Sequence, residues 1–202
     1  MKKILLAAVM MLTSVAAFAQ HEVGTFTLQP KVGLNLATLV GNDVDEAKIR
    51  PAIVAGVEGE YQLADIFSLS LGVLYSQQGA KSKDDPELGK MTMQMDYINV
   101  PLLANVYVAK GLAVKCGAQI GFNVRHKAKL AGHTFDLDDI AVWTDNAIST
   151  KKVDFSIPVG ISYEYSNVVI DARYNWGLTK SFKDLKCRNS VFQFTVGYKF
   201  EL

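Results

Sequence analysis

A strict alternation of apolar and polar side chains limits the fold of this chain more than any other feature of its sequence. The last twelve residues read VFQFTVGYKFEL, with an apolar residue at every even position and, from Gln193 on, a polar or small residue at every odd position. Because successive side chains of a β-strand point to opposite sides, this period of two predicts a strand with one apolar face. The pattern recurs in seven further segments, at residues 25–36, 52–63, 67–76, 97–108, 112–124, 153–165 and 168–178.

The connections between these segments also alternate, between tight and long. The long ones are polar and include charged stretches such as GNDVDEAKIR and KSKDDPELGK. Short turns at one end and long loops at the other are typical of outer-membrane β-barrels. With an even number of strands, we expect both termini on the short-turn, periplasmic side and the long loops outside the cell. The tight connections are near 64–66, 109–111 and 166–167, and the long ones are near 38–51, 80–92, 126–152 and 179–189.

A chain of this kind would cross a membrane only as a closed barrel. No stretch of about 18 apolar residues follows residue 19, so no transmembrane helix is expected there. Lipid cannot satisfy the hydrogen bonds of an open sheet edge, so the strands would have to close on themselves. The sequence therefore predicts an all-β fold, a closed antiparallel up-and-down transmembrane β-barrel of about eight strands.

A soluble, lipocalin-like ligand-binding barrel has the same alternation, but with the apolar faces inside. Besides the loop pattern, two features favour lipid outside. The polar faces carry small residues such as Ser70, Gly121 and Gly160, which suit a narrow interior. The apolar faces carry aromatic residues near both strand ends, like the girdles that mark membrane interfaces. The predicted interface aromatics are Tyr61, Phe67, Tyr163, Tyr165, Tyr198 and Phe200 at the short-turn end, and Tyr75, Phe122, Phe155, Tyr174 and Trp176 toward the loops.

Charged residues of both signs fall on the faces that would point into the barrel. Eight strands leave an interior that side chains about fill, without a wide aqueous channel. Charges in such a place have to pair, because an unpaired buried charge is costly. A structural salt-bridge plug is the favoured interpretation, and a narrow or gated charge-selective pore is the alternative. The predicted lumen charges are Lys31, Glu58, Glu60, Lys115, Arg125, Asp154, Glu164, Asp171, Arg173, Lys199 and Glu201.

The first residues, MKKILLAAVMMLTSVAAFAQ, have the layout of a secretory signal peptide. Lys2 and Lys3 precede an apolar run that is too short to span a bilayer comfortably, and Ala17-Phe18-Ala19 is a small-x-small cleavage site. We predict a signal peptide at 1–19 and a single outer-membrane barrel domain at 20–202. Cleavage there changes the formal charge from +1 to −1, so the basic excess expected of a nucleic-acid-binding protein is absent.

The sequence offers little for an active site or a metal. Its three histidines, His21, His126 and His133, form no recognisable catalytic arrangement with serine and aspartate, so no enzyme activity and no cofactor are predicted. The stretch RHKAKLAGHTFDLDD holds two of them near aspartates, but the spacing matches no EF-hand or zinc motif, and a polar surface loop is predicted. Cys116 is expected on the lipid face and Cys187 in a loop, too far apart for a disulfide.

Several stretches together resemble the PorT-like outer-membrane β-barrels of Gram-negative bacteria. They are KVGLNLATLVG, DYINVPLLANVYV, CGAQIGFNV, DFSIPVGISYEY, VVIDARYNWGLTK and FTVGYKF, which cover most of residues 30–200 in order. The resemblance implies a small barrel in the outer membrane. It does not imply one activity, because the founding member serves type IX protein secretion and most relatives have no assigned role. The final strand also resembles the signal that the barrel-insertion machinery reads.

From these features we predict a non-enzymatic protein of the Gram-negative outer membrane with a structural or surface-interaction role. Its expected partners are the outer-membrane lipid, the barrel-insertion machinery and a protein met at the surface. Two alternatives stay open at this stage. One is a membrane component of a type IX-like secretion or transport assembly, with a secretion-machinery partner. The other is the soluble ligand-binding barrel.

Overall fold

The computed structural model describes residues 21–41, 48–81, 91–130, 133–136, 152–179 and 187–202. The predicted signal peptide and much of each predicted long loop lie outside these residues. No helix in the described ranges is long and apolar enough to cross a membrane. The long strands are β1 (Phe26–Gly41), β2 (Arg50–Ala64), β3 (Phe67–Lys81), β4 (Met91–Ala109), β5 (Leu112–Leu130), β7 (Val153–Tyr165), β8 (Val168–Gly177) and β9 (Cys187–Tyr198). Two short strands, β6 (His133–Asp136) and β10 (Phe200–Glu201), add to them.

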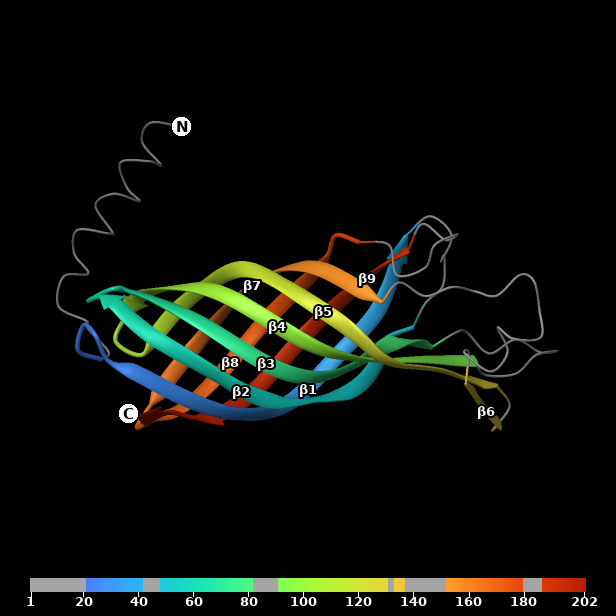
Figure 1. Ribbon diagram of the computed structural model, residues 1–202, viewed down its shortest axis with the longest axis horizontal. Coiled ribbons are helices and arrows are strands. Elements are labelled where there is room, and N and C mark those ends of the chain that lie inside the picture. Colours follow the sequence, from blue (N-terminus) through green and yellow to red (C-terminus); the bar gives the residue numbers. More distant parts are fainter. Residues whose placement is uncertain (1–20, 42–47, 82–90, 131–132, 137–151, 180–186) are drawn as a thin grey trace, which may run out of the picture.

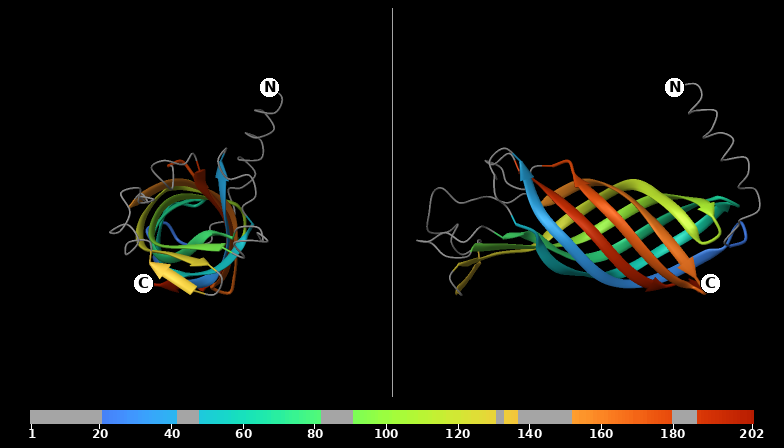
Figure 2. Two further views of the ribbon diagram at one scale, coloured as in Figure 1. Left: turned by 90° about the vertical axis from the view of Figure 1, so that its right-hand side faces the viewer. Right: turned by 180° about the vertical axis from the view of Figure 1, so that it is seen from behind.

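The eight long strands close into a barrel. Each pairs antiparallel with its neighbours in the order β1-β2-β3-β4-β5-β7-β8-β9, and β9 pairs back with β1. The closing register runs from Lys31 opposite Gly197 to Gly41 opposite Cys187. After β9, β10 pairs with the start of β1. The end-on view in Figure 2 shows the resulting ring. The predicted fold, a closed antiparallel barrel of eight strands, is confirmed.

Tight hairpins gather at one end of the barrel, where the C-terminus also lies (Figure 1). Gly111 in the β4–β5 turn has φ +76°, and in the β7–β8 turn Ser166 and Asn167 have φ +47° and +68°. Two consecutive positive φ values are typical of the type I′ turn, whose twist matches that of the flanking strands. The short connections predicted from the sequence are therefore true hairpins.

At the opposite end the strands are longer than the sequence analysis predicts. Residues 126–130 continue β5, and β6 pairs with them, with Leu130 opposite His133 and Lys127 opposite Asp136. The first part of the predicted loop at 126–152 is thus sheet, because backbone pairing with β4 and β6 continues beyond the ring. Asp138 and Asp139 lie outside the described residues.

The barrel carries its apolar side chains outside and its polar ones inside. Leu71 is 57% exposed and Phe194 is 49% exposed, whereas Asn105 is fully buried and Glu58 is 1% exposed. A soluble protein shows the opposite distribution, with charged side chains almost never fully buried unless they are paired. Inward serines and glycines give these buried charges room. At Gly160, for example, a Cβ atom would lie 2.6 Å from the Cβ of Arg173.

Candidate functional site

Five charged side chains meet in the middle of the barrel lumen, and we call them the central cluster: Lys31, Glu58, Lys115, Asp171 and Arg173. All five are between 1% and 4% exposed. Glu58 is the common partner, with its carboxylate oxygens 3.0 Å from Lys31 Nζ, 3.5 Å from Lys115 Nζ and 3.2 Å from Arg173 Nη2. The Asp171 carboxylate contacts the same three cations. Glu58 therefore holds the central cluster together from the β2 wall.

The central cluster joins walls of the barrel that are not neighbours. Glu58 lies on β2 and Lys115 on β5, with two strands between them in the sheet order. Arg173 lies on β8 and donates two hydrogen bonds to Asp171, at 2.8 Å from Nε and 2.6 Å from Nη2. Lys115 Nζ lies 3.3 Å and Lys31 Nζ 3.9 Å from Asp171 Oδ2. These ion pairs cross the lumen at one level, so the arrangement closes the interior there.

A second group, the mouth cluster, lies toward the short-turn end: Glu60, Tyr107, Glu164 and Lys199. Lys199 Nζ lies 3.0 Å from Glu60 and 2.9 Å from Glu164, and it donates to the Tyr107 hydroxyl at 3.2 Å. Tyr107 in turn donates to Glu60. Ser68 also donates to Glu60, at 2.5 Å. Sequence reasoning missed Tyr107, although its position in the alternation of β4 points it inward.

His21 covers the mouth cluster from the N-terminal side. Its Nε2 lies 3.1 Å from Glu164 Oε1, its Nδ1 lies 3.8 Å from Glu201 Oε2, and its side chain is 9% exposed. The next residues stay on the rim, since Gly24 N–H donates to the Gln62 carbonyl at 2.8 Å. Gly24 has φ +93°, a conformation that glycine adopts readily. From the sequence, His21 was only one of three histidines without a recognisable catalytic arrangement.

Near the loop end, polar groups give way to an apolar layer. Asp154, half-buried, accepts hydrogen bonds from Thr179 and from Asn189 Nδ2, the latter at 3.3 Å. Beyond it, buried apolar residues fill the interior. The alternation of methionines in MTMQMDY was the signal for this layer, because it continues the inward face of β4. The layer consists of Leu39, Ala80, Met95, Tyr97 and Cys187, with Met93 against it.

Three sequence predictions are corrected here. Arg125 was predicted in the lumen, but its side chain is 58% exposed, because an extra residue in β5 between Asn123 and Arg125 shifts the alternation. Glu201 was also predicted in the lumen; it lies opposite inward-facing Thr27, but it is 57% exposed because it sits at the open short-turn end of the barrel. Cys187 is not in a loop but begins β9, fully buried. Its thiol and that of Cys116 are not joined by a disulfide.

The predicted interface aromatics all lie on the outside of the barrel. Phe67 and Tyr174 are half-buried, and Tyr165 is the most exposed of the set, at 72%. Tyr174 and Phe192 pack with their ring centroids 4.6 Å apart. The other members of the set are exposed: Tyr61, Tyr75, Phe122, Phe155, Tyr163, Trp176, Tyr198 and Phe200.

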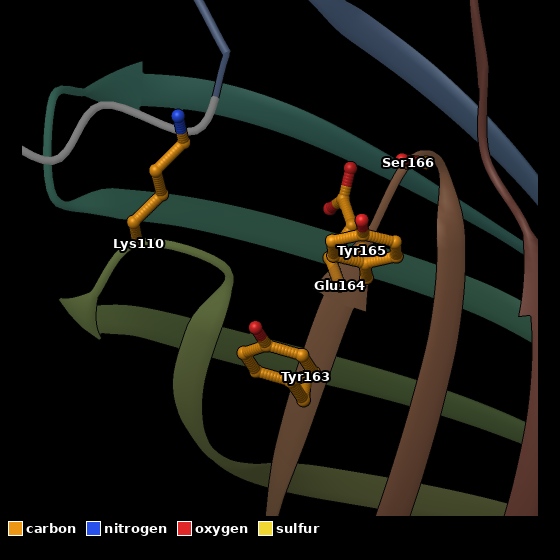
Figure 3. A pocket seen from close by; sticks show the side chains of 5 residues that line it. All are labelled: Lys110, Tyr163, Glu164, Tyr165 and Ser166. Atoms are coloured by element: carbon orange, nitrogen blue, oxygen red, sulfur yellow. The ribbon is translucent and has the colours of Figure 1, made fainter.

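A pocket of about 450 Å³ opens at the short-turn rim (Figure 3). Lys110 extends from the β4–β5 turn, while Tyr163, Glu164, Tyr165 and Ser166 line the pocket from the end of β7 and the turn after it. The lining combines a cation, a carboxylate and two phenols. Among the described side chains, no three histidine, cysteine or acidic residues group as a metal site would require. The interactions that the described side chains of the rim and the lumen can make are ion pairs and hydrogen bonds.

Comparison with known proteins identifies the kind of barrel. The sequence profile of the outer membrane protein beta-barrel domain matches residues 18–183. A search of curated protein sequences gives no match.

Two solved structures share the fold. One is Neisserial surface protein A, from Neisseria, with a TM-score of 0.56 and 17% identity over 87% of this chain and 97% of that one. Another is Ail, the attachment invasion locus protein of Yersinia pestis, with a TM-score of 0.51 and 15% identity over 89% of this chain and 100% of that one. At such identities the likeness concerns the fold alone.

Proposed function

Since the chain belongs to the outer membrane protein beta-barrel domain family, we propose that it is a sealed, non-enzymatic outer-membrane barrel that anchors loops for contacts at the cell surface. The observation that carries the sealed state is the central cluster. Its ion pairs link β2 with β5 and β8 across the lumen, and its members are at most 4% exposed. An ion crossing the barrel would have to break these pairs.

The layers on either side of the central cluster support the same proposal. The mouth cluster and His21 cover the short-turn side, and the apolar layer around Met95 and Tyr97 covers the loop side. An apolar constriction is itself unfavourable for ions, because it offers them no substitute for water. An ion passing through the lumen would therefore have to cross three successive layers: the mouth cluster with His21, the central cluster and the apolar layer.

Conductance across a planar bilayer tests whether the barrel is sealed. We expect no discrete current steps from the folded protein at neutral pH, because no continuous aqueous path crosses the central cluster. Protein that still shows heat-modified gel mobility after recovery from the bilayer preparation provides the control for correct folding. Reproducible single-channel steps from such protein would contradict the sealed barrel and favour the charge-selective pore.

The proposed orientation places the hairpins and the C-terminus in the periplasm and the long loops outside. It can be tested with Lys152→Cys at the loop end and Asp65→Cys at the hairpin end, two exposed positions. In intact cells, a membrane-impermeant maleimide is expected to label the first variant and not the second. The unsubstituted protein controls for labelling of Cys116 and Cys187. Labelling of Asp65→Cys alone would reverse the orientation.

A role in a secretion or transport assembly is the alternative, and the resemblance to PorT-like barrels is its support. Such a role would make secretion depend on this protein. If a strain that lacks the gene secretes the same proteins as its parent, the anchoring function is favoured. If the strain no longer secretes them, a role in a secretion or transport assembly is favoured.

A further inference from the structure

The outer surface of the barrel changes character abruptly near the loop end. Tyr75 on β3, Ile98 on β4 and Phe122 on β5 form one cross-strand row of outward apolar side chains. The next row toward the loops is Gln77, Asp96 and Arg125. Two residues along a strand correspond to about 7 Å. The apolar surface therefore gives way to a polar one within a single row.

Beyond this border lie three basic residues on neighbouring strands, which we call the basic patch: Lys48, Lys81 and Arg125. Lys81 ends β3, Lys48 pairs with it just before β2, and Arg125 lies on β5. From β2 to β5 the patch spans three strand spacings, about 15 Å.

Lys48 and Lys81 stand directly opposite one another. Their backbones exchange hydrogen bonds, at 2.7 Å from Lys48 N to Lys81 O and 3.1 Å in the other direction, and both residues are exposed. Like charges directly opposite in a sheet are unfavourable. Among the ion pairs of the described residues, none joins the amine of Lys48 or of Lys81 to a carboxylate within 4.0 Å. An anion bound between them would remove this repulsion.

The neighbouring carboxylate does not neutralise the patch. Asp96 is 3% exposed and accepts a hydrogen bond from the Tyr75 hydroxyl at 2.7 Å. Arg125 approaches it only to 4.0 Å and keeps 58% of its side chain exposed. The guanidinium is therefore available to a further acceptor on the outside of the barrel.

Among the described residues, the exposed charges differ in sign between the two ends of the barrel. The exposed charges at the hairpin end are the carboxylates of Glu22, Asp65 and Glu201 and a single amine, that of Lys110. At the loop end, the exposed charged residues with described side chains are all basic: Lys48, Lys81, Arg125, Lys152 and Arg188.

We infer that the basic patch binds the phosphate groups of phosphorylated glycolipid headgroups in the leaflet around the loop end. This inference rests on the proposed orientation, which places that end in the outer leaflet. Lysine and arginine near a membrane surface attract anionic lipid, and arginine binds phosphate by charge-assisted hydrogen bonds. Arg125 lies at the apolar border, and Lys81 lies four residues beyond Gln77 along β3, about 13 Å farther out. The patch therefore faces such headgroups from the side. Lys48 and Lys81 would share one phosphate, and Arg125 would bind another.

Lipid A and its dephosphorylated form are the probes that test this site. Binding of each to the detergent-solubilised, folded protein can be counted and titrated by native mass spectrometry. We expect lipid A to bind and the dephosphorylated form to bind weakly. In the double variant Lys48→Gln/Lys81→Gln, affinity for lipid A should fall about 30-fold, since each basic residue near a membrane surface contributes about 1 kcal/mol.

Arg188→Gln is the matched control. Arg188 is another exposed cation at the loop end, but it stands opposite Val40 and has no basic neighbour in that pair. Replacing Arg188 should lower the affinity for lipid A by less than about 3-fold. This is less than the effect of the roughly 1 kcal/mol that one basic residue in contact with a membrane surface contributes. Heat-modified gel mobility shows that each variant is folded.

Three results would overturn the inference. They are equal binding of the two lipid forms, unchanged binding by the double variant, and an equal loss in Arg188→Gln. None of these results bears on the sealed lumen, which the conductance measurement tests separately.

Discussion

Replacing Glu58 with alanine is expected to lower the free energy of unfolding by about 3–5 kcal/mol, the usual cost of removing one partner from a buried ion pair. Glu58 is 1% exposed and lies within 3.5 Å of Lys31, Lys115 and Arg173. Without it, three buried cations share the single carboxylate of Asp171. Urea unfolding of protein folded into lipid vesicles, followed by tryptophan fluorescence, measures the change.

Two further variants separate this effect from a general loss of structure. Glu201→Gln removes a carboxylate that is 57% exposed and is expected to cost less than about 0.5 kcal/mol, as surface substitutions usually do. The double variant Glu58→Gln/Lys31→Met removes one charge of each sign. It should recover part of the loss, by about 0.5–3 kcal/mol, because contacting residues are energetically coupled. A Glu58→Ala protein as stable as the parent would show that the central cluster does not hold the barrel together.

Leu71→Arg is expected to destabilise the membrane-inserted barrel by about 2–4 kcal/mol, the cost of arginine at the lipid-facing midplane of a barrel. Leu71 is 57% exposed on the outside of β3 and lies midway between Phe67 and Tyr75. An arginine there would face hydrocarbon along its whole side chain. Folding into vesicles of phosphatidylcholine, scored by heat-modified gel mobility and by urea unfolding, measures the loss.

Leu63→Arg is the control for depth. Leu63 is also an exposed leucine, 43% exposed, but it lies beside the β2–β3 hairpin, where a charged side chain can reach the interface. Its replacement should cost about 0–1 kcal/mol, as for basic residues near the interface of a barrel. A soluble, lipocalin-like barrel would have this face in water and would tolerate both substitutions equally. Equal effects of the two variants would therefore contradict the placement of lipid against Leu71.

The alternation along the chain was sufficient to place most of the lumen charges. Glu58 and Glu60 on β2, and Asp171 and Arg173 on β8, occupy the faces that a period of two assigns to them, because the side-chain direction in a strand depends only on parity. Parity failed at Arg125, where the strand is irregular, because the extra residue before Arg125 reverses the face of the residues after it. At Glu201 parity held, but the residue lies at the open end of the barrel and is exposed. Nothing in the local composition marks the irregularity before Arg125.

Local patterns in the sequence were enough to specify a barrel with a polar interior and an apolar exterior. Period-two patterning, tight turns and small inward residues act locally, and they depend only on the order of the residues. Which charges meet depends instead on the tertiary structure. Glu58 and Lys115 are 57 positions apart, and their contact requires the observed strand register and the narrow width of the closed ring. The basic patch arises in the same way, because Lys48, Lys81 and Arg125 come together only through pairing of neighbouring strands.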